Sequence, residues 1–295
     1  MGILDEIKQS YRQGGALTKL IYINVGVFIA IRLLQVFFSF STGSASVNEY
    51  PLLNWVSVPA DPMALLFKPW TIFTYMFVHY DFLHILVNML YLYWFGRIFL
   101  EFLNPRQLLG VYVLGGLTGV VFYLVSYNFI PVLHQQASYA ILMGASGSVM
   151  AILFAVTKYA PNHKIYLLFF GAVPLKYMAL AALVIDLISI TALSNTGGHL
   201  THIGGAAFGY FYGASIAKGS DVTLGFNRLM DGLAGLFSRK SKLKVTHKRP
   251  VNDMEYNTRK ISKQKEVDRV LDKIKASGYD SLNKEEKQVL FDASK

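Results

Sequence analysis

Ser146 is the residue of this sequence whose surroundings most resemble those of an enzyme nucleophile. It lies in the stretch Gly144-Ala145-Ser146-Gly147, and an apolar run that reaches Phe154 follows directly. In a soluble hydrolase such a serine lies at a strand-to-helix turn in water. Here the turn would lie at membrane depth, where a polar group is costly and by default functional. Ser146 is therefore either a packing residue among small neighbours or the nucleophile of an enzyme that works inside a membrane.

His202 is the leading candidate for the base that such a nucleophile needs. A serine hydroxyl becomes reactive when a neighbouring base removes its proton. A histidine with an ordinary pKa is largely neutral near pH 7 and can accept that proton. Taken alone, a histidine in a membrane helix is more often a buried or cavity-facing residue than a catalytic one. The spacing of small residues near Ser146 and His202 helps to decide whether His202 is catalytic or structural.

Small residues recur every four positions after both candidates: Gly205, Gly209 and Gly213 follow His202, and Gly147, Ala151 and Ala155 follow Ser146. Such stripes let the backbones of membrane helices approach closely. The two helix faces that can pack most tightly are therefore the faces whose ends carry Ser146 and His202. This coincidence favours a catalytic pair over two unrelated polar residues.

His84 and Asn88 are candidates for binding a negative charge that develops during the reaction. They stand at i and i+4 and so share one helix face. Both side chains can donate hydrogen bonds, and with the backbone N–H of Ser146 they would form an oxyanion hole. The alternative is a structural polar pair that ties two helices together. Gly144 and Gly147 suit a turn that needs a positive φ or a close backbone approach.

The other polar residues near the predicted spans carry weaker signals. Asp186 is an acid inside a predicted membrane helix, where such a residue usually caps or bonds a neighbouring helix, and it is not assigned as a third catalytic residue. His199 either orients His202 or has no role. The remaining histidines lie in predicted loops: His79, His134, His163 and His247.

Composition predicts an all-α, polytopic membrane protein. Hydrophobic residues make up 53% of the 295 residues, and a membrane-spanning helix needs about 20 largely apolar residues. Six runs are candidates, and three of them would escape a strict hydropathy cut-off because Gly, Ser or His lowers their hydropathy. They are Leu20 to Phe38, Phe82 to Leu103, Leu108 to Phe129, Ser146 to Tyr159, Leu175 to Leu193 and His202 to Ala217.

The charges predict the orientation of these helices. Lys and Arg number 28 against 18 acids, and most of the basic residues lie at or beyond Lys218. By the positive-inside rule both termini are cytoplasmic, in agreement with an even number of helices.

No aromatic-basic platform accompanies the charge, so we expect no nucleic-acid partner. The chain has no cysteine, which excludes disulfides, thiolate metal sites and a cysteine nucleophile.

Four parts follow from these patterns. Residues 1–19 form a polar cytoplasmic lead-in, and residues 20–218 form the six-helix membrane domain. Residues 219–262 are read as a basic linker centred on 238–244. Residues 263–295 show helical spacing, and Asn283 with Glu286 resembles a capping box. We therefore expect a small C-terminal helical hairpin, whose partner the sequence does not indicate.

The motifs together resemble a known family. Gly-x-Ser-Gly at 144–147, His-x-x-x-Asn at 84–88 and His202 before Gly-Gly-Ala-Ala-Phe-Gly resemble the rhomboid intramembrane serine proteases over residues 18–218. The resemblance implies a six-helix bundle with Ser146 as nucleophile and His202 as general base and then acid, without a carboxylate, a metal or a cofactor. It assigns His84, Asn88 and the Ser146 amide to the oxyanion hole. It also implies transmembrane proteins as substrates, in a multi-pass protein of the bacterial cell (inner) membrane.

Two positions depart from the family pattern. Many members have Trp-Arg in the first external loop, where this chain has Trp70-Thr71, and an aromatic residue often stands four positions after the nucleophile, where this chain has Met150. A thioether can still pack against an imidazole. We expect an altered rate or specificity, because neither change removes a catalytic atom.

Three other functions were weighed. A catalytically silent rhomboid-like protein that binds membrane clients usually lacks the serine or the histidine, and this chain has both. A metalloenzyme, suggested by His199-x-x-His202 and His79-x4-His84, fails on the number of ligands, because the sequence places no carboxylate beside these histidines. A transporter is not supported, since the sequence shows no inverted repeat.

Overall fold

The computed structural model describes residues 2–42, 51–79, 81–167, 171–192, 195–237 and 253–293. The chain divides into two compact units, Met1–Phe237 and Ser238–Lys295, which are described separately. Both are helical, and the strands of the described residues are confined to two short pairs. The all-α class expected from the sequence is therefore confirmed.

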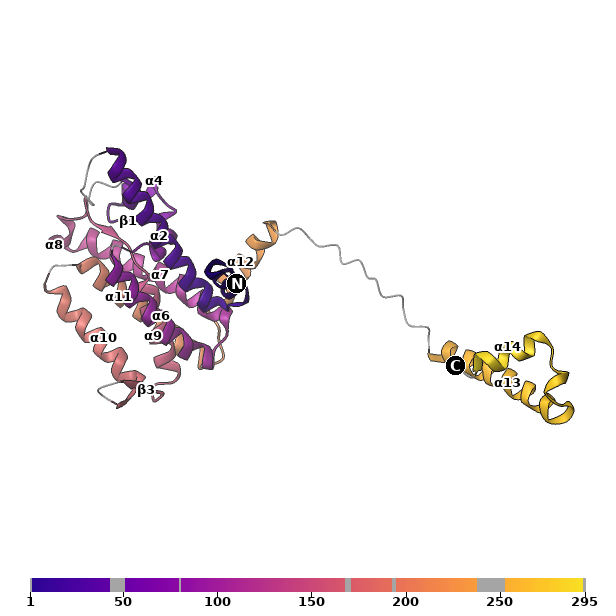
Figure 1. The fold of residues 1–295 in the computed structure, drawn as a ribbon. Helices are drawn as coiled ribbons and strands as arrows, with labels where there is room; N and C mark the ends of the chain where they lie inside the picture. The colour runs from indigo at the N-terminus through magenta and orange to yellow at the C-terminus, as the bar shows by residue number, and fades with distance from the viewer. Residues whose placement is uncertain are drawn as a thin grey trace. The chain divides into compact units, whose positions relative to one another are not determined.

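Each of the six predicted runs forms a helix of the first unit (Figure 1). They are α2 (Ala16–Thr42), α6 (Phe82–Phe102), α7 (Pro105–Phe129), α9 (Ser146–Tyr159), α10 (Leu175–Ile190) and α11 (Thr196–Ile216). Among the described residues, α2, α6 and α7 are long and apolar enough to cross a membrane by hydropathy alone, and α9 is a shorter apolar helix. Since α11 carries many Gly residues, its low hydropathy agrees with the expectation that a strict cut-off would miss it.

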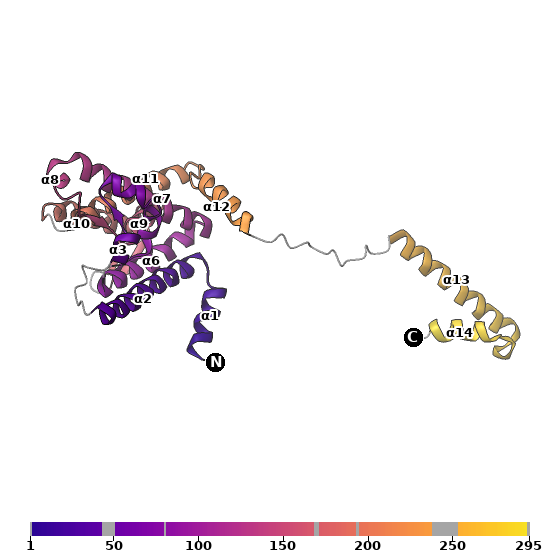
Figure 2. The same cartoon turned by 90° about the horizontal axis from the view of Figure 1, so that it is seen from above.

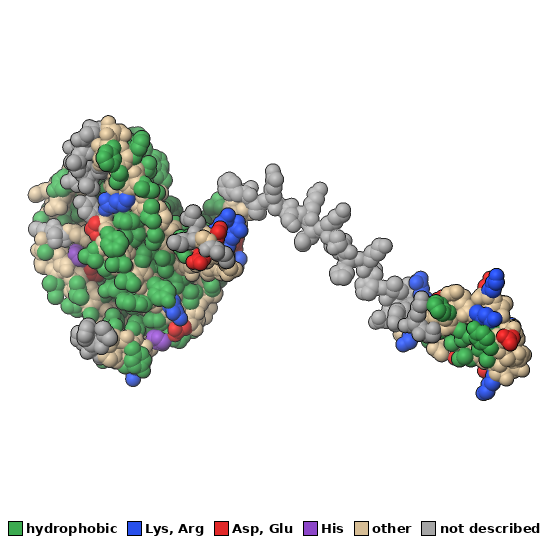
Figure 3. All heavy atoms as spheres, viewed as in Figure 1, with side chains coloured by type: hydrophobic (Ala, Val, Ile, Leu, Met, Phe, Trp, Pro, Cys, Tyr) green, Lys and Arg blue, Asp and Glu red, His purple; other side chains and the backbone are tan. Residues whose placement is uncertain are grey.

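The surface of this unit suits a lipid environment. Large apolar side chains cover most of the face seen in Figure 3. Several are more than half exposed although they lie within helices of the bundle, among them Leu33, Phe37 and Ile188 at 65% each. Exposed apolar surface on this scale is rare on soluble monomers. It is expected where a helix faces lipid, which supports the polytopic membrane bundle.

The small-residue stripes bring α9 and α11 together as the sequence predicts. A Cβ atom added to Gly205 would overlap the carbonyl oxygen of Gly147, and one added to Gly209 would overlap that of Ala151. Gly115 of α7 faces Ala151 in the same way. The backbone of α9 is thus in contact with α11 and α7, while α2 and α10 lie on opposite sides of the bundle (Figure 1). Close backbone packing of this kind holds the N-terminal end of α9 in place.

Helix-capping residues set where α6 and α7 begin. The carboxylate of Asp81 accepts a 2.8 Å hydrogen bond from the backbone N–H of His84, which places His84 in the first turn of α6. Asn104 and Gln107 form a capping box at the start of α7, and Pro105 occupies its first position. These are the residue types that favour a helix N-terminus.

The long segment between α2 and α6 contains short elements and two stacked tryptophans. These elements are α3 (Pro51–Val56), β1 (Val58–Pro59), α4 (Pro62–Phe67), α5 (Thr71–Thr74) and the 3-10 turn η2 (Tyr75–Phe77). The rings of Trp55 and Trp70 stack with centroids 5.8 Å apart, and Lys68 lies 5.5 Å over the Trp55 ring. Thr71 donates a 2.7 Å hydrogen bond to the Lys68 carbonyl. Such an aromatic cluster is typical of a segment that lies at the membrane–water interface.

Two antiparallel strand pairs fix the loops at the ends of α9. β1 pairs with β2 (Ile141–Leu142), just before the Ser146 turn, and α8 (Pro131–His134) precedes β2. β3 (Lys164–Leu167) pairs with β4 (Gly171–Pro174) in the connection from α9 to α10. Residues 168–170 of this connection lie outside the described residues.

Two helices flank the membrane bundle in the first unit. α1 (Ile3–Gln13) lies in the predicted lead-in and is seen beside α2 in Figure 2. α12 (Leu224–Phe237) occupies residues that the sequence was expected to leave as a linker. Arg106 at the start of α7 pairs with Asp231 of α12 at 3.1 Å. The expectation overlooked α12 because residues 219–262 were read as one polar and basic segment.

The second unit is the expected helical hairpin. It consists of α13 (Asp253–Ser277), the turn η3 (Tyr279–Ser281) and α14 (Lys284–Ala293), so its first helix begins about ten residues earlier than expected. Asn283 and Glu286 exchange the two hydrogen bonds of a capping box, and Lys273 pairs with Glu286 at 2.8 Å. The basic centre predicted for the linker, 238–244, lies outside the described residues.

Candidate active site

The turn before Ser146 is held by backbone contacts from two directions. Gly144 has φ +125°, a conformation that favours glycine, and its N–H donates a 2.9 Å hydrogen bond to the carbonyl of Tyr75. The Tyr75 hydroxyl donates to the carbonyl of Gly116 in α7. Ser146 is the first residue of α9 and is half-buried. The backbone N–H groups of the first turn of α9 therefore have no partner within the helix and are oriented toward the Ser146 end.

His84 lies beside this turn. The Cβ position of Gly144 would be 2.9 Å from Nε2 of His84 and 3.7 Å from Oγ of Ser146, so the ring and the hydroxyl flank one point. Asn88 is buried one helical turn further along α6, and its side-chain nitrogen donates a 2.8 Å hydrogen bond to the His84 carbonyl. The structure thus brings His84 to the turn that holds Ser146, whereas Asn88 bonds to the backbone of His84 from one helical turn further along α6.

His79 lies in the loop before α6, within the predicted external segment, but it is buried against the turn that precedes Ser146. Its side chain is 1% exposed, and its Nε2 accepts a 3.4 Å hydrogen bond from the N–H of Ala145, the residue before Ser146. Its ring meets that of His84 edge-on with centroids 5.1 Å apart. Burial, with a smaller contribution from His84, lowers the pKa of His79 from 6.5 to about 4, against an opposing effect of the Phe77 carbonyl. A neutral His79 therefore supports the nucleophile turn.

His202 stands on α11 with its Nδ1 bound to Asp186. The Nδ1–Oδ1 distance is 2.8 Å, and His199 makes a second 2.8 Å contact from its own Nδ1 to the same oxygen. The expectation that Asp186 bonds a neighbouring helix is confirmed. The sequence did not predict that its partner would be the candidate base, because the packing of α10 on α11 decides which residue of α11 Asp186 reaches.

The end of α11 that carries His202 lies against the end of α9 that carries Ser146. A Cβ on Gly147 would be 2.7 Å from Cγ2 of Thr201, the residue before His202. His84 and His202 are also close enough to interact electrostatically. Among the described residues, no hydrogen bond joins Ser146 to His202. Catalytic hydrogen bonds are often long before substrate binds and shorten in the complex.

The described residues also contain one set of side chains that could hold a metal. These are Asp186, His199 and His202, whose ligand atoms all lie within 4.8 Å of one another.

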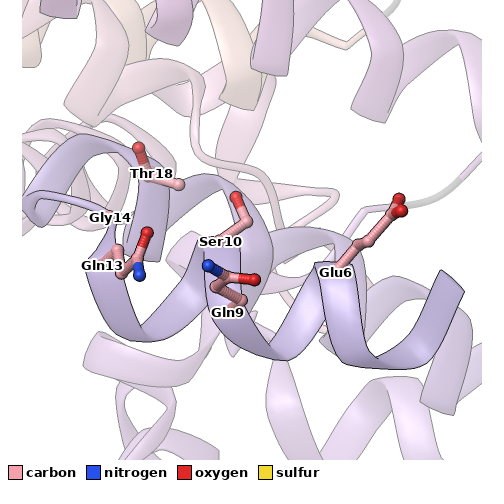
Figure 4. Close-up of a pocket in the computed structure, with 6 residues that line it drawn as sticks. All are labelled: Glu6, Gln9, Ser10, Gln13, Gly14 and Thr18. Atoms are coloured by element: carbon pink, nitrogen blue, oxygen red, sulfur yellow. The ribbon is translucent and has the colours of Figure 1, made fainter. Parts of the chain in front are cut away.

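A separate surface hollow lies between α1 and α2, lined by Glu6, Gln9, Ser10, Gln13, Gly14 and Thr18 (Figure 4). That hollow contains none of the candidate catalytic residues and is separate from the candidate active site.

The fold and site define a multi-pass helical membrane protein with a serine at a helix N-terminus and histidines around it. The Rhomboid domain model matches residues 67–219, about half of the chain. The chain belongs to the rhomboid family. A family of unknown function (DUF6576) matches residues 252–295, the hairpin of the second unit.

Curated relatives carry rhomboid names. The chain is 32% identical over 157 residues to RHOMBOID-like protein 12, mitochondrial, of Arabidopsis thaliana, which covers 50% of this chain and 47% of that protein. It is 33% identical over 138 residues to Presenilin-associated rhomboid-like protein A, mitochondrial, of Danio rerio, with 46% and 34% covered. It is 29% identical over 98 residues to Rhomboid protease GlpG of Salmonella newport, with 28% and 35% covered.

The chain thus spans about half or less of the length of these relatives. An integral, multi-pass membrane protein is shown by the family and by the apolar helices. The expectation of a bacterial cell membrane is not supported, because the first two relatives named are mitochondrial proteins.

Proposed function

We propose that this protein is an intramembrane serine endopeptidase that hydrolyses peptide bonds in or near transmembrane segments of other membrane proteins. The observation that carries this proposal is the packing of the small-residue stripe of α11 on α9. It brings the His202 end of one helix to the Ser146 end of the other. His84 lies beside the same turn, so a nucleophile, a base and a donor share one half-buried end of the bundle.

The reaction begins with attack of the Ser146 Oγ on the carbonyl carbon of the scissile bond. Nε2 of His202 takes the hydroxyl proton, and the carbonyl oxygen becomes an oxyanion. That charge receives hydrogen bonds from the Ser146 N–H and from His84, with Asn88 as a further donor after its amide turns from the His84 carbonyl. The positive end of α9 favours negative charge at the same point.

The intermediate collapses when His202 returns the proton to the leaving amine. The C–N bond breaks, and an acyl group remains on Ser146. Water then attacks the acyl carbon while His202 takes one of its protons. The C–O bond to Ser146 breaks, and the proton passes back to the Ser146 oxygen, so the enzyme is restored.

Asp186 has a positioning role in this scheme. Its carboxylate accepts a hydrogen bond from Nδ1 of His202. A donated Nδ1–H fixes the tautomer in which Nε2 is free to take a proton. The family resemblance implies a catalytic dyad of Ser146 and His202 with no carboxylate. The contact of Asp186 with His202 departs from that expectation.

The site is expected to serve substrates that reach it through the bilayer. Both termini are proposed to be cytoplasmic, with residues 20–218 as the peptidase and the remaining parts on the cytoplasmic side. Reporter fusions at each terminus test this orientation, and fractionation of a tagged protein tests the membrane. The identity of Met150, which is buried on α9, and of Thr71 is expected to affect rate or specificity.

A catalytically silent rhomboid-like protein is the second candidate, because the mitochondrial names of two relatives do not state a protease. Labelling of the purified full-length protein with a fluorophosphonate separates the two. The peptidase proposal predicts labelling that is lost in Ser146→Ala and kept in Ser148→Ala, since Ser148 is a buried serine two residues along the same helix. Equal labelling of both variants, or no labelling of the wild type, contradicts it.

A further inference from the structure

Two imidazoles and one carboxylate meet where α10 contacts α11. Nδ1 of His199 and Nδ1 of His202 each lie 2.8 Å from Oδ1 of Asp186. The two histidines stand three residues apart on α11 and therefore project from neighbouring positions of one helix face. The ring nitrogens and the carboxylate oxygen all lie within 4.8 Å of one another.

This set of donors matches the ligands of a first-row transition metal. Zn²⁺ binds His nitrogen and carboxylate oxygen at about 2.0–2.2 Å, and sites with three protein ligands keep a fourth position open. Two ligands of a tetrahedral ion at such distances are about 3.3 Å apart. The present nitrogen–oxygen distances are therefore about half an ångström too short. Small rotations of the three side chains would create the site.

The low solvent exposure of these three side chains also favours the binding of a metal ion. The side chains of His199, His202 and Asp186 are 17%, 21% and 7% exposed, so they are shielded while still open on one side. A partly dry site strengthens the attraction between a dication and a carboxylate. Asp186 supplies the carboxylate that the sequence did not place beside these histidines.

We propose that Asp186, His199 and His202 form a binding site for a divalent transition-metal ion such as Zn²⁺, and that occupation of this site inhibits the enzyme. The inhibition rests on the proposed peptidase function, whereas the binding does not. An ion on Nδ1 of His202 displaces the hydrogen bond to Asp186. A neutral imidazole then carries its proton on Nε2, the atom that must take the proton of Ser146. The metal thus acts as an inhibitor and not as a cofactor.

Binding is tested by titrating the metal-free full-length protein in detergent with ZnCl₂ in a calorimeter. Three proteins are compared: wild type, His199→Gln and the control His134→Gln, which removes an exposed histidine of α8. Glutamine can still donate a hydrogen bond to Asp186, so His199→Gln keeps the packing while removing a ligand. We expect wild type and His134→Gln to bind one Zn²⁺ at this site, and His199→Gln to bind it at least tenfold more weakly. Equal affinity in His199→Gln, or no binding to the wild type, overturns the proposed site.

Inhibition is tested separately by cleavage of a transmembrane reporter, with each variant compared with its own metal-free rate. We expect Zn²⁺ to stop cleavage by wild type and His134→Gln, chelation with EDTA to restore it, and the inhibiting concentration to rise at least tenfold in His199→Gln. Zn²⁺ that binds at this site without slowing cleavage overturns the inhibitory role. A protein that binds Zn²⁺ as expected and never cleaves would instead contradict the peptidase, so the two failures are distinguishable.

Discussion

The carboxylate of Asp186 on α10 and the imidazole of His202 on α11 are joined by a 2.8 Å hydrogen bond through Nδ1. The side chain of Asp186 is only 7% exposed, and an acid buried in a membrane helix needs a partner. His202 and His199 are those partners. The candidate base is thereby oriented by a residue from a different helix, so the geometry of the site depends on how α10 packs on α11.

Replacement of Asp186 by Asn is expected to lower kcat at least tenfold and leave KM nearly unchanged. Asn can donate as well as accept, so it can stabilise the tautomer of His202 whose Nε2 already carries a proton. Steady-state cleavage of a transmembrane reporter measures both constants. Asp186→Glu should recover part of the loss because it restores a carboxylate. A variant that loses stability but keeps kcat would show that Asp186 is merely structural.

Replacement of Gly205 by Val is expected to separate α9 from α11. A Cβ at this position would overlap the carbonyl of Gly147, and overpacking of this kind costs about 1–3 kcal/mol. Thermal unfolding in detergent should show a lower midpoint, with loss of activity. Gly26→Val in α2 is the matched control, since a Cβ there meets nothing within 4 Å. Equal midpoints for the two variants would contradict the close packing.

Stability is expected to fall as the pH decreases from about 6.5 to 4 because of His79. Burial lowers its folded pKa from 6.5 to about 4, so in this range the unfolded chain binds a proton that the folded protein does not. The contribution is fully present above pH 6.5, and its loss reaches about 3 kcal/mol near pH 4. Unfolding midpoints between pH 7.5 and 4.5 should therefore decrease less in His79→Gln than in the wild type. Identical pH dependence in both proteins would show that His79 is not the group responsible.

The helix pairing was predictable because it depends on local spacing. Glycine and alanine at every fourth position define one face of a helix regardless of its neighbours, and the pairing of Gly205 with Gly147 follows from that face. The positive φ of Gly144 was also predictable from local sequence. Glycine adopts a positive φ readily, and Gly144 lies in the short turn before Ser146.

The contacts of His79 and Asp186 were not predictable, because they depend on how separate segments of the chain pack together. His79 is buried by the packing of its loop on the turn before Ser146, and no periodicity marks such a residue. Asp186 reaches His202 across the contact between α10 and α11, which the spacing of residues within either helix does not specify. Helix α12 was missed because its apolar residues are spaced as in an amphipathic helix inside a polar segment.

Cleavage of a transmembrane reporter by the purified protein in liposomes tests the central claim most directly. Wild type, Ser146→Ala and Ser148→Ala are compared at equal protein amounts, with the folding of each checked by thermal unfolding. The account predicts cleavage by the wild type and by Ser148→Ala, and none by a folded Ser146→Ala. Cleavage that persists in Ser146→Ala would contradict the assignment of Ser146 as the nucleophile.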